Sequence, residues 1–187
     1  MSGRPRLFVV SGPSGTGKGT LIGKVREARP ELGLTVSATT RPPRPGEADG
    51  VAYHFMDDEE FQRRVDAGEF VEWAWVSKHR YGTLCSEVDK CLARNASVVL
   101  EIDVQGALNV RNIYPDAVLI FIEPPSFEEL EHRLRARGTE DDEAIRVRLE
   151  TARHEMELAG EYDVRIVNDD IDRATRELLE TLHRYET

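Results

Sequence analysis

A glycine-rich segment near the N-terminus constrains this chain more than any other feature. Residues 12–20 read Gly-Pro-Ser-Gly-Thr-Gly-Lys-Gly-Thr, between an apolar run at residues 7–11 and a stretch of helical character. Glycines let the backbone curl until successive N–H groups point into one concavity, where phosphate oxygens can accept from all of them. Lys18 and the positive end of the following helix add charge at the same place. The alternative is a strand-to-helix turn without a ligand, but the complete spacing in this setting favours a phosphate-binding loop.

One position of the loop departs from the usual pattern. The residue after the lysine is commonly Ser or Thr, whose hydroxyl meets magnesium, but here it is Gly19 and the hydroxyl follows at Thr20. Phosphate binding is unaffected by this change. The metal ligand is therefore expected to be either Thr20 or water.

Composition excludes several classes of partner. The chain has 187 residues, 40% of them hydrophobic and 32% charged, with a net charge of −10. This is the size of one domain with its own core. Proteins that bind nucleic acids or anionic membranes draw most of their affinity from a positively charged surface. We therefore expect neither nucleic acid nor membrane as a partner. A polyphosphate ligand would need a local basic site.

The two cysteines and the N-terminus indicate a reducing, cytoplasmic setting. Cys85 and Cys91 form no Cys-x-x-Cys motif and have no clustered histidines, so a zinc site or disulfide framework has little support. The first residues are too polar for a secretory signal, and no apolar stretch approaches the roughly 20 residues of a membrane span. We therefore expect a cytoplasmic protein with reduced thiols.

Short apolar runs alternate with stretches of helical character. This alternation is typical of an α/β fold with a parallel sheet covered by helices on both faces. Ser126 with Glu129, and Thr139 with Asp142, have the spacing of helix starts. The strands are predicted at residues 7–11, 97–102, 117–122 and 164–167.

The segment from about residue 34 to 81 has a different pattern of polar and apolar residues. Residues 51–55 and 70–76 alternate polar and apolar side chains and include aromatic residues, which favours half-buried strands of a mixed or antiparallel sheet. We interpret the segment as an inserted lobe. A period of two places Glu72 on one face with Phe70, opposite Trp73.

Three further groups of residues could bind a nucleotide. Arg41 and Arg44 lie in a proline-rich turn that suits a phosphate, although a solvated turn is an equal alternative. Glu72 either faces water or lines a pocket, where its carboxylate could accept two parallel N–H bonds from guanine. Asp103 follows a predicted core strand, where it either binds a ligand at the sheet edge or caps the next helix.

Together these segments resemble the guanylate kinase family, nearly from end to end. The arginine-proline block and the Asp-Val-Gln-Gly segment are far more specific than the phosphate loop. The segments that carry the resemblance are residues 12–18, 37–47, 69–74, 81–83, 101–106, 137–140 and 166–170. The resemblance implies transfer of the γ-phosphoryl group of ATP to GMP, with Mg²⁺ as the cofactor of ATP.

The resemblance also implies a role for individual residues. The catalytic residues would be Lys18, Arg41, Arg137 and Arg148. The ATP site would comprise Gly12, Pro13, Ser14, Gly15, Thr16, Gly17, Lys18, Gly19, Thr20, Arg133, Arg137 and Asn168, the last near the adenosine. The GMP site would comprise Ser37, Arg41, Arg44, Tyr53, Glu72, Tyr81, Thr83, Asp103 and Arg148.

Within this family pattern the chain divides into a core, a GMP-binding lobe and a helical lid. The core would be residues 1–33, 97–125 and 157–187, the lobe about 34–96 and the lid about 126–156. The lid arginines have the alternative of being solvated salt-bridge partners on acidic helices.

Phosphoryl transfer mainly needs alignment and charge neutralisation, so no histidine or serine is assigned as a catalytic base. Two other functions remain open. The Lys18-Gly19-Thr20 ending also resembles adenylate kinases, which suggests another nucleoside monophosphate kinase, although the arginine-proline block and Glu72 count against it. A noncatalytic guanylate-kinase-like interaction module is the second, but such modules usually lack an intact phosphate loop.

Overall fold

A four-stranded parallel sheet forms the core of the protein. The computed structural model describes residues 4–136 and 141–187. The strand order is β6-β1-β7-β8, with β1 at Leu7–Ser11, β6 at Val98–Glu101, β7 at Val118–Glu123 and β8 at Val164–Val167. All residues of β1 and β7 are buried, as expected for central strands covered on both faces.

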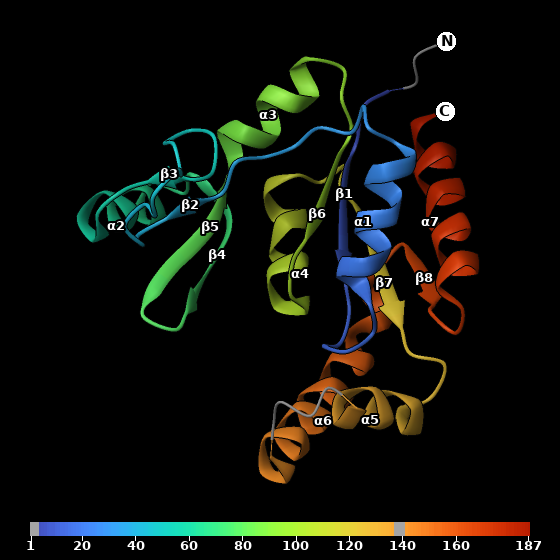
Figure 1. Ribbon diagram of the computed structural model, residues 1–187. Helices are drawn as coiled ribbons and strands as arrows, with labels where there is room; N and C mark the ends of the chain where they lie inside the picture. The colour runs from blue at the N-terminus through green and yellow to red at the C-terminus, as the bar shows by residue number, and fades with distance from the viewer. Residues whose placement is uncertain (1–3, 137–140) are drawn as a thin grey trace.

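Helices cover both faces of this sheet, which confirms the predicted fold class. On one face, α1 (Lys18–Ala28) and α7 (Ile171–Glu186) lie side by side, and Phe8 and Val10 pack against them. On the other face, α4 (Val104–Ile113) and the 3-10 turn η1 (Leu158–Glu161) pack against Val9 and Leu119. The two ends of the described chain meet, since the Arg4 amide donates to the Glu186 carbonyl at 2.8 Å (Figure 1).

A second sheet stands beside the core and has the mixed character that its sequence predicted. Its order is β3-β2-β5-β4, with β2 at Ala38–Thr39, β3 at His54–Phe55, β4 at Phe70–Val76 and β5 at His79–Leu84. Strands β2 and β3 are parallel, while β5 pairs antiparallel with β2 and β4. Helix α2 (Asp58–Asp66) covers one face through Phe61, and α3 (Cys85–Ala93) leads back to the core (Figure 1).

The prediction that Phe70 and Glu72 share one face of β4 is wrong, because the strand contains a β-bulge. The pairing with β5 shifts between Phe70 and Glu72, so one extra residue interrupts the period of two. Phe70 and Trp73 therefore lie on the same face, and both ring systems contact Phe61 of α2. Glu72 lies on the opposite face and does not share the side of Phe70.

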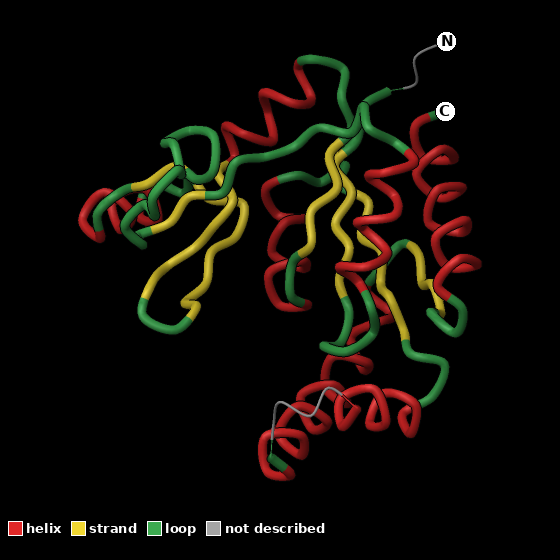
Figure 2. Tube along the Cα trace, in the orientation of Figure 1, coloured by secondary structure: helices red, strands yellow, loops and turns green. Residues whose placement is uncertain are grey.

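Two helices project beyond the carboxyl ends of the core strands. They are α5 (Phe127–Ala136) and α6 (Asp142–Glu157), and they pack through a small cluster that includes Leu130 and Ile145. Figure 2 shows them next to the loop that follows β1. The Glu129 amide donates to Ser126 Oγ at 3.1 Å, which confirms that predicted helix start.

The second predicted start in this helical pair needs a correction. Helix α6 begins at Asp142 and its N-cap is Asp141, whose carboxylate accepts from the Ala144 amide at 2.8 Å. Thr139, the expected first residue, lies outside the described residues. A carboxylate serves this position as well as a hydroxyl would, because either accepts from the exposed amides of the first turn.

Across residues 4–136 and 141–187, none of the helices combines the length and the apolar character needed to cross a bilayer.

Candidate active site

The glycine-rich loop adopts a conformation that only glycine allows at several positions. Gly12, Gly15 and Gly17 have φ values of 136°, 94° and 88°. A Cβ atom at Gly12 would come within 2.3 Å of the Ile122 carbonyl oxygen on β7. The loop therefore passes directly against the neighbouring strand, and glycine is needed there for both backbone angle and space.

Lys18 and Asn168 fix the shape of this loop from two sides. Lys18 Nζ donates to the carbonyls of Gly12 at 2.6 Å and Pro13 at 3.0 Å, so its charge lies over the loop concavity. Asn168, only 5% exposed, donates through Nδ2 to the Thr16 carbonyl at 2.7 Å. Asn168, predicted to lie near the adenosine, thus makes a contact that supports the loop.

A cavity of about 610 Å³ opens in front of the loop. Three carboxylates share its wall with Lys18: Glu101 at the end of β6, Asp103 after it and Glu155 near the end of α6. Burial raises the pKa of Glu155, as does the charge of Asp103, while Lys18 opposes them. Glu155 was not singled out from the sequence, since one glutamate on an acidic helix carries no distinguishing pattern.

The lid arginines that the structure describes reach the core. Arg148 Nη1 donates to Ser14 Oγ in the loop at 2.8 Å. Arg133 Nη2 donates to the Asn168 carbonyl at 3.1 Å, while its Nε pairs with Glu129 at 2.8 Å. Arg133 therefore makes two contacts: one from α5 to the core, and one with Glu129 that matches the alternative role of a salt-bridge partner on an acidic helix. The remaining lid candidate, Arg137, lies outside the described residues.

The arginine-proline turn is organised by a glutamate. Arg41 Nη2 lies 2.9 Å from both carboxylate oxygens of Glu47, and the Arg44 amide donates to the same carboxylate at 2.7 Å. Hydrogen bonding to Glu47 raises the pKa of Arg41, as does its contact with Tyr81. The guanidinium carbon of Arg41 lies 5.5 Å from the centre of the Tyr53 ring. Glu47 belongs to the same sequence motif as these arginines, but no local pattern marked it as a functional residue.

The aromatic residues and hydroxyls of the second sheet gather on the face opposite α2. The rings of Tyr53 and Tyr81 meet edge to face, with centres 5.9 Å apart. Ala38 and Leu84 point toward α2, so alternation directs Ser37 and Thr83 to the other face. The Ser37 carbonyl accepts from the His54 amide at 2.8 Å, which extends the ladder between β2 and β3. Arg44 is exposed on the adjoining turn.

Glu72 and Asp103 form the junction between this face and the core. Thr83 Oγ1 donates to Glu72 Oε1 at 2.9 Å. Burial raises the pKa of Glu72, and the negative charge of Asp103 adds to the shift, while the Thr83 hydrogen bond opposes it. Asp103 caps α4, with Oδ1 accepting from the Gly106 amide at 2.7 Å, and it also lines the cavity in front of the loop. The capping alternative for Asp103 is therefore confirmed, and ligand binding at the sheet edge stays a prediction.

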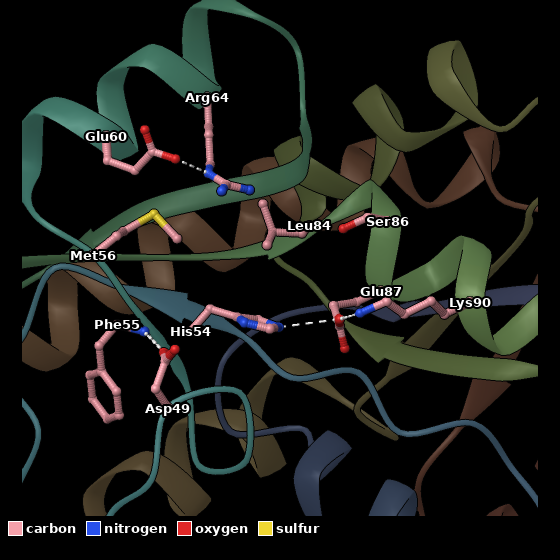
Figure 3. A pocket seen from close by; sticks show the side chains of 10 residues that line it. All are labelled: Asp49, His54, Phe55, Met56, Glu60, Arg64, Leu84, Ser86, Glu87 and Lys90. Atoms are coloured by element: carbon pink, nitrogen blue, oxygen red, sulfur yellow. Dashed lines mark hydrogen bonds and ion pairs between the residues drawn. The ribbon is translucent and has the colours of Figure 1, made fainter.

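A second cavity, of about 440 Å³, lies on the α2 side of the second sheet (Figure 3). Met56, Arg64 and Leu84 contribute to its wall, and His54 Nε2 lies 3.2 Å from Glu87 Oε1 across it. Of the predicted ATP and GMP ligands that the structure describes, none lines this cavity. It is separate from the face that carries Tyr53 and Tyr81.

The donors around Gly19 suit a hard cation. A Cβ atom built at Gly19 would lie 3.6 Å from Glu101 Oε2, so carboxylate and hydroxyl oxygens flank the loop at Gly19 and Thr20. Such oxygens are the ligands that Mg²⁺ prefers, together with phosphates and water. Within the described ranges no cluster of three or more His, Cys, Asp or Glu side chains forms a complete metal site.

Phosphoryl transfer between nucleotides requires a donor-phosphate site and an acceptor site that face each other. The cavity in front of the loop is the candidate for the first and the open face of the second sheet is the candidate for the second, with Asp103 and Glu72 between them. The fold and the site define the chain as a P-loop nucleotide kinase.

Comparison with known proteins identifies the family. The family model described as guanylate kinase matches residues 4–185, and the chain belongs to this family. Guanylate kinase from Thermobifida fusca is 53% identical over 93% of this chain and 89% of its own length. Guanylate kinase from Thermosynechococcus vestitus is 52% identical over 90% and 88%.

A solved structure agrees with this assignment. The crystal structure of guanylate kinase from Anaplasma phagocytophilum matches with a TM-score of 0.69 and 32% identity, and the match covers 100% of this chain and 88% of that one. The predicted family, fold class and phosphotransferase function are confirmed. The alternatives of another monophosphate kinase and of a noncatalytic module are not favoured.

Proposed function

We propose that the enzyme transfers the γ-phosphoryl group of ATP to GMP or dGMP, giving ADP and GDP or dGDP. The observation that carries the substrate assignment is the Thr83–Glu72 pair, with Asp103 beside it at the junction of lobe and core. In this division the core is residues 1–33, 97–125 and 157–187, the GMP lobe about 34–96 and the lid about 126–156. The enzyme acts in the cytoplasm, the setting expected from the sequence.

Guanine recognition follows from the donor and acceptor pattern of its edge. N1 and N2 of guanine carry hydrogens, and O6 accepts. In the proposed complex the Thr83 hydroxyl turns from Glu72 to O6, and Ser37 donates to the same oxygen. This frees the Glu72 carboxylate to accept from N1 and N2, with Asp103 accepting a further N2 hydrogen. Adenine offers the reverse pattern, so it would leave these buried groups unpaired.

The GMP phosphate is assigned to the basic end of the same face. Arg41 and Arg44 present guanidinium groups from a turn stiffened by prolines, and Tyr53 and Tyr81 add two hydroxyls. Glu47 holds Arg41 through both carboxylate oxygens, so the guanidinium is oriented before the substrate arrives. This lowers the conformational entropy that Arg41 loses on binding.

The ATP phosphates are assigned to the glycine-rich loop. Its amides and Lys18 hold the β and γ phosphates, and Arg133, Arg137 and Arg148 bring positive charge from the lid. Glu101 and Thr20 would hold Mg²⁺ directly or through water, and the bound ion neutralises phosphate charge. Asn168 supports the loop that carries these groups.

The chain's residues act mainly by alignment. Arg41 and Arg44 hold the GMP phosphate as the nucleophile, and Lys18 and Arg148 offset the charge that develops on the transferred group. Lid closure excludes water, which would otherwise accept the phosphoryl group.

The test is a coupled assay for ADP release with GMP, dGMP, AMP, UMP and dTMP as acceptors. We expect GMP and dGMP to be used, and AMP to fall short in kcat/KM by about 10⁴, the scale set by unpaired buried polar groups. Equal use of AMP would refute the proposal. No ADP release with any acceptor would favour the noncatalytic module.

A further inference from the structure

Arg80 on β5 is a charged side chain that the proposed chemistry does not use, yet it is almost fully buried. The residue is 5% exposed. Its guanidinium carbon lies 4.6 Å from the centre of the Phe61 ring and 5.5 Å from that of Trp75. Burying a charge is costly unless it is paired and hydrogen-bonded, so a specific role is expected for this residue.

Among the described residues, the polar partners of the Arg80 guanidinium all lie on α2. Nη1 donates to Gln62 Oε1 at 2.8 Å. Nη2 donates to the Asp58 carbonyl at 2.5 Å and to Asp58 Oδ1 at 2.9 Å, and Nε donates to the same carboxylate oxygen at 3.2 Å. Because the guanidinium is planar and its donors point in fixed directions, it sets both the distance and the rotation of α2 relative to β5.

The backbone of Arg80 holds the start of the arginine-proline turn. Its amide donates to Thr40 Oγ1 at 3.0 Å, and its carbonyl accepts from the Thr40 amide at 3.1 Å. Thr40 directly precedes Arg41, and Tyr81 directly follows Arg80. Side chains alternate along a strand, so a fixed Arg80 on the α2 side fixes the direction of Tyr81 on the opposite side.

We infer that Arg80 is a positioning residue for the acceptor phosphate, acting through Arg41 and Tyr81. The inference rests on the proposed function, since it takes these two residues as ligands of the GMP phosphate. Arg80 itself lies on the far side of the sheet and touches no substrate. Its loss would let β5 and the arginine-proline turn shift together, and small displacements of substrate-binding groups are costly in rate and affinity.

The main experiment compares Arg80→Met with Arg63→Met in the full chain. Arg63 is also on the α2 side of the lobe, but its side chain is 59% exposed and pairs with Glu60 and Glu69. For Arg80→Met we expect KM for GMP to rise about tenfold or more, with KM for ATP and kcat at saturating GMP within about threefold of wild type. For Arg63→Met all three should stay within about twofold.

Two further variants separate positioning from folding. Arg80→Lys keeps the charge but loses the planar set of donors, so its KM for GMP should lie between wild type and Arg80→Met. Asp58→Asn weakens the same contact at a side chain that is 71% exposed, so it should fold and shift KM for GMP in the same direction by less. A loss of thermal stability or kcat in all these variants with unchanged KM for GMP would overturn the inference.

Calorimetric titration with GMP keeps this inference distinct from the proposed function. Wild-type protein that neither binds nor phosphorylates GMP would overturn both. Wild-type protein that phosphorylates GMP, combined with equally tight GMP binding by Arg80→Met, would overturn only the role of Arg80. Equal increases of KM for GMP and ATP would also overturn it, because they would show no preference for the acceptor site.

Discussion

Arg148 on α6 donates a 2.8 Å hydrogen bond to the hydroxyl of Ser14, so the lid contacts the phosphate loop directly. These residues are far apart in the sequence, and the contact brings a guanidinium to the place assigned to the transferred phosphoryl group. In the proposed function this contact makes α6 part of the donor site.

Replacing this arginine tests that role. Arg148→Met should lower kcat by about 10² or more, because it removes a charge that stabilises the transition state. Arg146→Met is the matched control, since Arg146 lies on the same helix and pairs with Glu143 on the surface. Steady-state rates with ATP and GMP would show the difference. Equal rates for the two variants would contradict the assignment of Arg148.

Lys18 should be required for turnover and dispensable for folding. Lys18→Met removes the charge over the loop, and we expect kcat to fall by about 10² to 10³ with an unchanged circular dichroism spectrum. Lys24→Met is the control on the same helix, because Lys24 pairs with Asp172 at the surface. Near-normal turnover by Lys18→Met would remove the lysine from the mechanism.

The raised pKa of Glu72 predicts an acid limit on GMP binding. Burial and the nearby Asp103 raise this pKa above 4.5, so the carboxylate gains its proton at a higher pH than an ordinary glutamate. A protonated Glu72 cannot accept both guanine hydrogens, and KM for GMP should rise as pH falls through that pKa. Glu72→Gln should lose this acid limb and have a high KM for GMP throughout. Glu69→Gln, at a partly exposed position just before the strand, should keep the wild-type profile.

Gly12 and Gly19 should respond oppositely to an added side chain. At Gly12 a Cβ would meet a backbone oxygen at 2.3 Å, so Gly12→Ala should disrupt the loop and abolish ATP binding. At Gly19 the nearest atom would be Glu101 Oε2 at 3.6 Å, so Gly19→Ser should fold normally and place a hydroxyl beside that carboxylate. Titration of activity with Mg²⁺ should then show a changed metal dependence for Gly19→Ser. An unchanged curve would mean that a hydroxyl there is dispensable.

Glu87 should stabilise the connection between lobe and core. Its carboxylate accepts from the Val36 amide at 3.1 Å and from Lys90 at 2.6 Å. His54 Nε2 lies 3.2 Å from the same carboxylate. Burial alone would raise the pKa of Glu87, but Lys90, the Val36 amide and His54 together hold it below 4.5. A lowered folded-state pKa gives stability that is present above 4.5 and is lost as pH falls through the folded value.

The measurement for Glu87 is the melting temperature across pH. Glu87→Gln should melt roughly 2–12 °C below wild type at pH 7, from a loss of about 1–3 kcal/mol for a buried hydrogen-bonding group. The difference should shrink below pH 4.5. Glu59→Gln, at an exposed position of α2, should match wild type. A gap that stays constant down to pH 3 would show that the charge of Glu87 is not responsible.

The core and the phosphate loop could be predicted from the sequence because their signals are local. Apolar runs of strand length, followed by helical stretches, indicated the parallel sheet, and the order of glycines and Lys18 indicated the anion site. The capping pair of Ser126 and Glu129 was recognised for the same reason. Each of these signals lies within a few residues of chain, where spacing alone constrains the backbone.

The faces of β4 could not be predicted in this way. A period of two holds only while the ladder is regular, and the bulge between Phe70 and Glu72 depends on pairing with β5. The second helix start shifted to Asp141 because several acidic and hydroxyl side chains nearby can cap equally well. The local sequence does not show which of these neighbouring side chains caps the helix.

The sequence by itself determined the fold class, the phosphate loop and the types of side chain available to bind a guanine nucleotide. Only the tertiary structure decided that Glu72 meets Thr83 and Asp103, that Glu47 holds Arg41, and that Arg80 is buried between α2 and β5. The physical reason is that burial and pairing depend on residues brought together from distant parts of the chain. A charged side chain has the same letter in the sequence whether it ends in water or between two aromatic rings.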